Sequence, residues 1–244
     1  MSSDGRWVAG IDGCPGGWLA VLRRVGDPDS CRIHFADRFA AVLGLDPTLS
    51  ILAVDMPVGL PERAGVGGRR AEAAVRRHLG PRQSSVFSVP SRAAVACTDY
   101  RQACGVALQT SDPPRKVSRQ AFHLFAKIRE IDALMVPALE TRVYEVHPEL
   151  AFWRLNGEQP MSRPKKIGNR PSPDGLDERA ALLERNGFDP ALLRQRPPKG
   201  AARDDLIDAA ANCVIAERIA LGMARPFPED FDRDGRGLRM AIWA

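Results

Sequence analysis

The stretch WVAGIDGCPGGW, residues 7–18, decides the fold. It opens with a short apolar run containing valine and isoleucine, which predicts a strand that ends at Asp12. The glycines after Asp12 supply turn chemistry, and the apolar residues 18–22 predict a second strand. The chain therefore begins with a glycine-rich hairpin whose first strand ends in an acidic residue.

Three later stretches extend this hairpin into a sheet. Residues 31–36 alternate between polar and apolar, and residues 50–54 (SILAV) are apolar after the first, as in a strand buried on both faces. Residues 141–146 alternate again and predict a fifth strand. With helices between and after these strands, the pattern predicts an α/β fold with a mixed five-stranded sheet flanked by helices.

Helical spacing dominates the rest of the chain. Residues 62–138 are expected to form a mostly helical insertion after the fourth strand, and residues 204–221 a long alanine-rich helix. Residues 156–173 are rich in proline, glycine and basic residues, which favours a mobile basic loop. We expect residues 1–244 to form a single domain.

Composition narrows the class of protein. Hydrophobic residues make up 44% of the chain, but no apolar run is long enough to cross a bilayer, and the N-terminus lacks the features of a secretory signal. The five cysteines form no CxxC pair, which is typical of reduced thiols and predicts a cytoplasmic protein. The formal net charge of +5 makes nucleic acid a candidate partner, and a homodimer is left open.

Asp12 and Asp55 share one setting, because each follows an apolar run predicted to be a buried strand. An unpaired buried carboxylate is costly, so an aspartate in this place calls for a cation or strong hydrogen-bond donors. Either residue could instead cap the turn that follows it.

A second acidic group lies around the predicted last strand. Glu145 is within the strand and Glu149 just beyond it, and the sequence does not decide which of them faces a site. His147 lies between them and could be a ligand, a proton shuttle, a substrate-binding group or a packed side chain.

Three aspartates open the last helix. Asp204 could be its N-cap, since acidic residues favour a helix N-terminus, but capping does not account for Asp208. Asp205 and Asp208 share a face of this helix, whose later positions are nearly all apolar or small. A buried helix that carries acids on its first turns suits a metal site at the edge of a sheet.

Together these acids predict a divalent-metal site, because Mg²⁺ and Mn²⁺ prefer oxygen ligands and can drive phosphodiester cleavage from carboxylates on separate elements. The predicted metal ligands, for Mg²⁺ or Mn²⁺, are Asp12, Asp55, Glu145, Glu149 and Asp208. The predicted catalytic residues are Asp12, Asp55, Glu145, Asp205 and Asp208. The predicted substrate-binding residues are Arg92, His147, Lys165 and Lys166, of which the three cations could hold a scissile phosphate or lie on a solvated surface.

Five motifs in this order resemble a known family. They are GIDGCPGGW (residues 10–18), AVDMPVGLP (53–61), SVFSVPSR (85–92), YEVHPEL (144–150) and DDLIDAAANC (204–213). Over about residues 8–221 the chain resembles the predicted RNase H-like nuclease family, a domain of unknown function numbered 429. The resemblance implies an RNase H-like core with Asp12 on the first strand and Asp55 at the end of the fourth. It also implies that Glu145 and the Asp205/Asp208 pair complete the site of a metal-dependent nuclease.

Two other classes of function remain open. In ATP-using phosphotransferases of the actin-like type, an Asp-x-Gly turn after the first strand handles phosphate, and Gly13, Gly16 and Gly17 could do so here. Those proteins are usually duplicated and longer, however, and no second hairpin of this kind occurs in the chain. The third class is a non-catalytic binding protein that keeps the fold.

Overall fold

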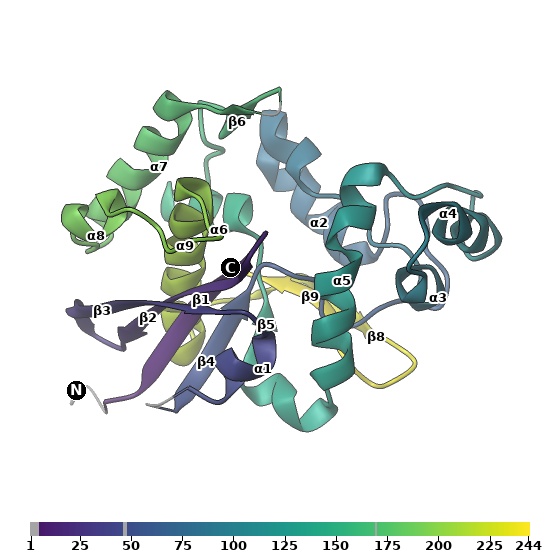
Figure 1. Ribbon diagram of the computed structural model, residues 1–244, viewed down its shortest axis with the longest axis horizontal. Coiled ribbons are helices and arrows are strands. Elements are labelled where there is room, and N and C mark those ends of the chain that lie inside the picture. The colour runs from purple at the N-terminus through teal and green to yellow at the C-terminus, as the bar shows by residue number, and fades with distance from the viewer. Residues whose placement is uncertain (1–4, 46–47, 169) are drawn as a thin grey trace.

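The computed structural model describes residues 5–45, 48–168 and 170–244, and its centre is one five-stranded sheet (Figure 1). The strands, in chain order, are β1 (Trp7–Cys14), β2 (Gly17–Arg24), β3 (Asp27–Ala36), β4 (Leu49–Val54) and β5 (Val143–Glu145). Their order across the sheet is β3-β2-β1-β4-β5. The first three pair antiparallel, and β4 and β5 run parallel to β1. The predicted α/β fold with a mixed five-stranded sheet is confirmed.

The first strand is longer than the sequence predicts. β1 continues through Asp12 to Cys14, because the turn to β2 takes only residues 15–16. Asp12 therefore still pairs with Leu19 of β2, whereas the parallel neighbour β4 has already ended at Val54 beside Ile11. On one side the backbone of Asp12 is paired with β2, and on the other side it faces the end of β4.

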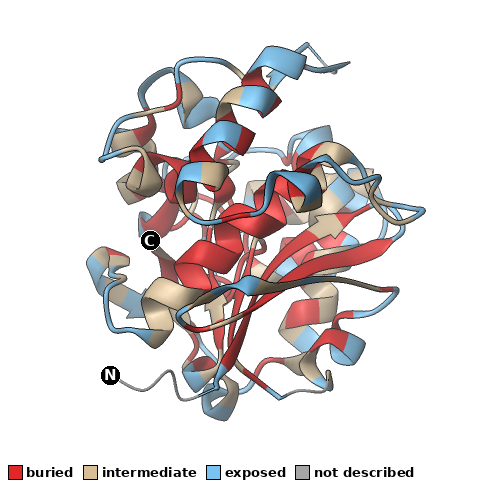
Figure 2. Cartoon of the chain, turned by 90° about the vertical axis from the view of Figure 1, so that its left-hand side faces the viewer, coloured by how far each residue is buried: buried red, intermediate tan, exposed pale blue. Residues whose placement is uncertain are grey.

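Helices cover both faces of the sheet. One face packs against α9 (Arg203–Ala220), with α6 (Pro148–Leu155), α7 (Pro173–Arg185) and α8 (Pro190–Arg194) beyond it. The other face carries α1 (Phe39–Leu43), α3 (Arg92–Ala96), α4 (Tyr100–Gln109) and α5 (Arg119–Leu134). Figure 2 shows α9 and the strands under it as one continuous buried layer.

Gly10 is the point where α9 lies closest to the sheet. A Cβ atom at this position would be 1.9 Å from the backbone nitrogen of Cys213 and 2.2 Å from the carbonyl oxygen of Ala209. A glycine inside a strand permits such an approach of another backbone. The contact fixes the position of the first turns of α9 along β1.

The region predicted as a helical insertion is indeed rich in helices. It contains α2 (Arg70–Leu79), the 3₁₀ helix η1 (Gly80–Ser85), and α3 to α5, and the 3₁₀ helix η2 (Pro137–Thr141) follows. The predicted loop around residues 156–173 includes the short hairpin of β6 (Lys166–Ile167) and β7 (Arg170–Pro171).

A C-terminal hairpin of β8 (Pro226–Arg233) and β9 (Arg239–Trp243) packs against α2, and the sequence pattern did not predict it. Over the described ranges no helix is both long and apolar enough to cross a membrane. All five cysteines are free thiols, and four of them are buried.

Candidate acidic site

Asp12 and Asp55 lie side by side at the carboxyl ends of β1 and β4. The backbone N–H of Asp55 donates to the carbonyl oxygen of Ile11 at 3.0 Å, which continues the parallel pairing by one residue. Because side chains alternate along a strand, Asp12 and Asp55 project from the same face of the sheet. The two carboxyl groups are close enough to influence the pKa of each other.

The first turns of α9 bring Asp208 to this pair. The contact at Gly10 seats the helix on β1, and the side-chain amide of Asn212 donates to the carbonyl oxygen of Ile11 at 3.1 Å. Asp208 is one turn before Asn212 and only 3% exposed. Three aspartates from separate elements therefore form one acidic cluster, defined as the buried Asp12 and Asp208 and the half-buried Asp55.

The electrostatics of this cluster are unfavourable. Burial and the neighbouring carboxylates of Asp208 and Asp55 raise the pKa of Asp12 well above its ordinary value. Burial, with the charge of Asp208, raises the pKa of Asp55 to about 7. Burial also raises the pKa of Asp208, although Lys165 opposes this. Grouped carboxylates with raised pKa values mark a candidate functional site.

The positive charge next to the cluster is the ammonium group of Lys165, which precedes β6 and forms an ion pair with Asp208 Oδ2. Burial alone lowers the pKa of Lys165, but Asp208 and then Asp12 raise it above its ordinary value. Lys165 is the predicted phosphate-binding cation that does lie at the acids, and it neutralises one of them.

The donor set fits a divalent ion in its chemistry. All three members carry carboxylate oxygens, which Mg²⁺ and Mn²⁺ prefer, and Oδ1 of Asp208 is buried without a hydrogen-bond partner. Over the described residues, however, no three acidic, histidine or cysteine side chains are already placed to hold one ion. The predicted metal site is thus a set of suitable donors, and their convergence on one ion remains a prediction.

Glu145 lies on the opposite face of the sheet from Asp55. It pairs in register with Val54, one residue earlier in β4, so strand alternation turns it away from the acidic cluster. There it forms a buried ion pair with Arg69, which also donates to Glu72 Oε1 at 2.6 Å. Glu145 Oε2 accepts from the N–H of Val58 at 2.8 Å. The predicted role of Glu145 as a ligand is not supported by this arrangement.

Glu149 lies on the same side as Asp208 but is held by a second arginine. Arg179, whose side chain is fully buried, donates to both carboxylate oxygens of Glu149 at 2.6 and 2.8 Å. The charges of Asp208 and Lys165 both act on Glu149, so it borders the acidic cluster. Glu149 therefore adjoins the cluster on the Asp208 side, while Glu145, from the other face of the sheet, also acts on Asp55 and lines the same small cavity.

The acidic residues in the first turn of α9 have different roles. Asp205, rather than Asp204, caps α9, because its Oδ2 accepts from the N–H of Ala202 at 2.7 Å. Asp204 forms an ion pair with Lys166 at 2.9 Å. Burial still raises the pKa of Asp205 to about 6, so it remains close to the acidic cluster. The charge of Lys166 is therefore neutralised by Asp204.

Arg92 and His147 take different places from those predicted. Arg92 donates to Asp132 at 3.1 Å and forms an ion pair with Asp234 at 2.5 Å. Its charge is therefore neutralised by acids outside the acidic cluster. Burial lowers the pKa of His147 to about 4, which makes it neutral at pH 7 and unsuited to shuttle protons there. His147 and Asp55 both line a small cavity, into which Glu145 also reaches.

In the glycine turn after Asp12, the backbone donor of Gly16 is already bound within the protein. The N–H of Gly16 donates to the carbonyl oxygen of Gly200 at 2.9 Å, and a Cβ atom on Gly16 would be 2.7 Å from the Cα of Gly200. This backbone donor is therefore already used within the protein. The predicted phosphate role of Gly16 in an actin-like phosphotransferase is not favoured.

Four residues that shape the site were not predicted from the sequence: Gly10, Arg69, Arg179 and Asn212. A glycine in the middle of an apolar strand was the available signal for Gly10. The arginines carry no local signal, because their partners are 76 and 30 residues away along the chain.

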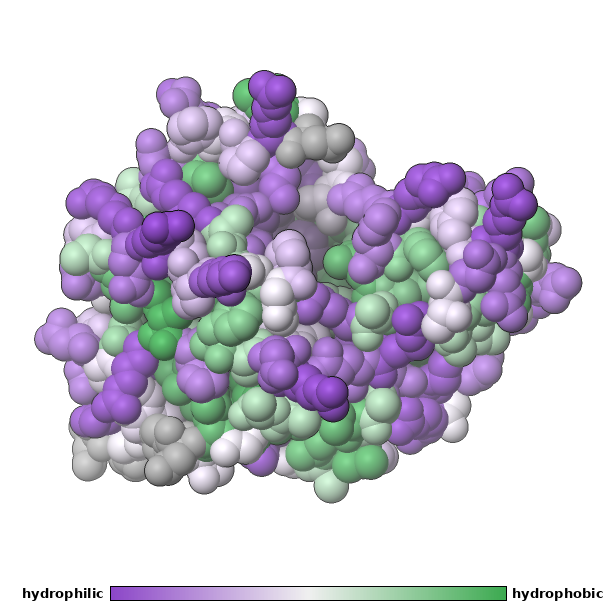
Figure 3. All heavy atoms as spheres, viewed as in Figure 1, coloured by the Kyte–Doolittle hydropathy of each residue, from purple (hydrophilic) through white to green (hydrophobic). Residues whose placement is uncertain are grey.

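The acidic cluster opens toward a hollow in the surface. In Figure 1 the carboxyl ends of β1 and β4 point between the group around α7 and the group around α2 and α5. Figure 3 shows the surface hollowed between these two groups, with hydrophilic residues on its upper margin. The hollow thus lies on the side of the molecule toward which these two strands end.

Comparison with curated proteins and with solved structures finds no match. A comparison with protein families does find one, over residues 10–233, which include α9 and all of the five-stranded sheet except residues 7–9 of β1. The chain belongs to that family, described as Protein of unknown function (DUF429).

Proposed function

We propose that the protein is a divalent-metal-dependent nuclease, that is, a phosphodiester hydrolase, on an RNase H-like core. The observation that carries this proposal is the acidic cluster of Asp12, Asp55 and Asp208, none of which forms an ion pair with an arginine in the part of the chain that the structure describes. Its members come from the first strand, the end of the fourth strand and the last long helix, the places that the family resemblance implies.

Asp12, Asp55 and Asp208 would hold Mg²⁺ or Mn²⁺, with Glu149 next to them. When bound, such an ion supplies Lewis-acid stabilisation of the phosphate and a more acidic water. Because the pKa values of the aspartates are raised, a divalent cation is the partner that best favours their ionised forms. Lys165 lies at the acids and would counter the charge of a substrate phosphate.

The test is a cleavage assay on single- and double-stranded DNA and RNA with Mg²⁺ or Mn²⁺. Asp12→Asn and Asp55→Asn should each lower the cleavage rate by about 10³-fold, equivalent to about 4 kcal/mol of transition-state stabilisation. Asp37→Asn is the matched control, because Asp37 is exposed on the surface. Cleavage that survives in both site variants, or that needs no divalent ion, would rule out this function.

A further inference from the structure

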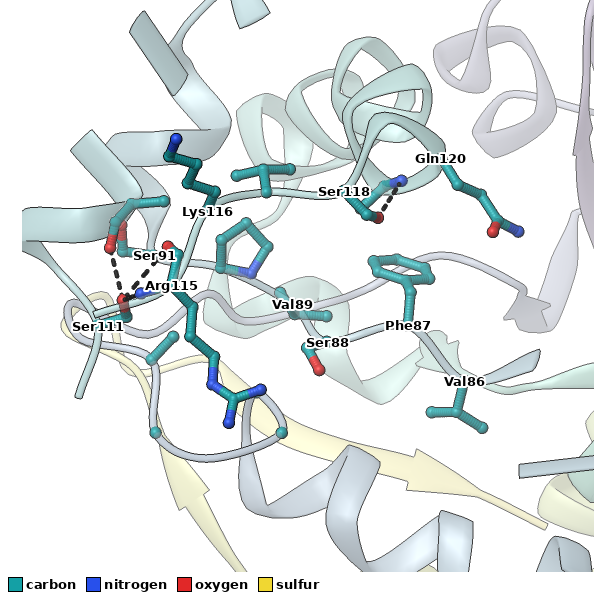
Figure 4. A pocket seen from close by; sticks show the side chains of 18 of the residues that line it. Val86, Phe87, Ser88, Val89, Ser91, Ser111, Arg115, Lys116, Ser118 and Gln120 are labelled. Atoms are coloured by element: carbon teal, nitrogen blue, oxygen red, sulfur yellow. Dashed lines mark hydrogen bonds between the residues drawn. The ribbon is translucent and has the colours of Figure 1, made fainter. Parts of the chain in front are cut away.

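A second, larger cavity lies on the insertion side of the acidic site (Figure 4). Its volume of about 520 Å³ is within the range of small-molecule binding sites. Three loop regions enclose it: the glycine loop at residues 64–68, the segment 83–91, and residues 107–121. None of the three aspartates of the acidic cluster lines this cavity.

The lining of this cavity is positive and contains no acidic residue. Arg76, Arg115 and Lys116 contribute cationic side chains, and neither aspartate nor glutamate lies among the residues that enclose the space. Arg76 donates to the carbonyl oxygens of Gly67 at 2.7 Å and Val86 at 2.9 Å. These bonds tie two walls of the cavity together, and they go to neutral acceptors, although the charge of Glu72 also acts on Arg76. An anionic ligand is therefore favoured.

Several polar side chains around the cavity are free to bind a ligand. Within the described part of the chain, none of the following has a side-chain hydrogen bond or ion pair: Gln83, Ser84, Arg115, Lys116 and Gln120. Ser111 Oγ accepts from the backbone N–H of Arg115 at 2.7 Å and so fixes the start of that side chain. Figure 4 shows the Arg115 guanidinium extending past Val89 and Ser88, and Lys116 pointing to the opposite end.

An apolar wall faces these groups. Val86 and Val89 are buried, and Phe87 between them is half-buried, with no ring contact to another described aromatic residue. In Figure 4 the ring of Phe87 projects toward Ser118 and Gln120. A flat heteroaromatic group can stack on such a ring, because every nucleobase presents a π face.

The same wall separates this cavity from the acids. Val86, Phe87 and Val89 also line the small cavity that contains Asp55 and His147. A ligand in the larger cavity would therefore lie one residue layer from the acidic cluster.

We infer that the larger cavity binds a nucleotide unit, with its base against Phe87 and its phosphate on Arg115. This inference rests on the proposed nuclease function, for which the bound unit is the nucleotide next to the scissile phosphate. The flat base of a nucleotide matches the apolar wall, and its anionic phosphate matches the cations. The hydroxyl groups of its sugar match the free serine and glutamine side chains.

The test measures binding of AMP, CMP, adenosine and inorganic phosphate by calorimetry to the full chain in EDTA, so that metal at the acids plays no part. AMP should bind more tightly than adenosine or phosphate alone. Arg115→Gln should weaken AMP binding about tenfold, and Phe87→Leu by a similar factor through lost stacking. Arg101→Gln, an exposed arginine of the same insertion, should leave the affinity unchanged.

Asp55→Asn separates this inference from the proposed function, because that variant should lose cleavage but keep AMP binding. Thermal melting confirms that each variant is folded. The inference is overturned if neither nucleotide binds at about 5 mM, a concentration that would reveal even millimolar affinity. It is equally overturned if Arg115→Gln and Phe87→Leu bind AMP as the wild type does, or if Asp55→Asn alone abolishes binding.

Discussion

Two kinds of buried or half-buried carboxylate meet at one end of the sheet, and they are neutralised differently. Glu145 and Glu149 are each held by a buried arginine, Arg69 and Arg179 respectively. Among the described residues, Asp12, Asp55 and Asp208 form no ion pair with an arginine, and Lys165 pairs with Asp208. The difference teaches that burial alone does not identify a functional acid: the glutamates are built into the fold, and the aspartates are left able to bind a cation.

The largest effect is expected where a glutamate loses its arginine. Arg179→Met should lower the free energy of unfolding by about 3–5 kcal/mol, because Glu149 is left as an unpaired buried charge. Chemical denaturation measures this, and the double variant Arg179→Met/Glu149→Leu should recover much of the loss. Arg194→Met, which breaks an exposed pair with Glu184, should cost less than about 1 kcal/mol. Equal losses at Arg179 and Arg194 would contradict the comparison.

Disturbing the helix that carries Asp208 should come next. Gly10→Ala places a methyl group against the backbone of α9 and should cost about 3 kcal/mol, with loss of any cleavage activity. Thermal unfolding and the nuclease assay measure the two effects. Gly105→Ala, at a helical glycine with nothing within 4 Å of the new Cβ, is the control and should be neutral or stabilising. If both variants melt alike, the contact at Gly10 does not position α9.

Removing Lys165 should make the aspartates of the acidic cluster bind a divalent cation more tightly. Lys165→Gln should raise the affinity for Mn²⁺ about tenfold, or about 1.4 kcal/mol, because the ammonium group no longer competes for Asp208. Isothermal titration calorimetry gives the affinity, and Lys199→Gln, at an exposed lysine, is the control. An unchanged or weaker affinity would mean that Lys165 does not compete with the ion.

The smallest expected effect concerns pH. The pKa of Asp55 is raised from 3.8 to about 7, so between these values the folded state binds more protons than the unfolded state. Stability from this group is thus present at low pH and is lost as the pH rises through that window. In EDTA, Asp55→Asn should therefore raise the melting temperature at pH 8 by about 2–4 °C, for about 1 kcal/mol, and change it less at pH 4. A variant that melts below the wild type at pH 8, or that gains equally at both pH values, would contradict this sign.

The sequence predicted the aspartates better than the glutamates, for a physical reason. An aspartate directly after an apolar strand, or on an apolar helix beyond its cap, has a local pattern that indicates a buried charge. Whether Glu145 or Glu149 is neutralised depends on which arginine the fold brings to it, and no local pattern carries that information. The same is true of Lys165, which meets Asp208 across 43 residues.

The fold itself was predictable where the burial pattern was strong. The apolar runs of β1, β2 and β4 identified the centre of the sheet, and long apolar spacing identified α5 and α9. The C-terminal hairpin was missed because only one residue of β8, Phe227, is buried, so that strand shows no alternation. The exact end of β1 was missed because a turn of two residues allows pairing to run past Asp12.

The distance along the chain between β1 and α9 also governs how the protein folds during synthesis. The helix that covers β1, β2 and β4 begins at Arg203, nearly 200 residues after the first strand. Until that helix leaves the ribosome, one face of the sheet has no cover, and contacts of such long range slow folding. The nascent chain therefore carries Asp12 and Asp55 long before it can complete the acidic cluster, which forms only after α9 has been synthesised.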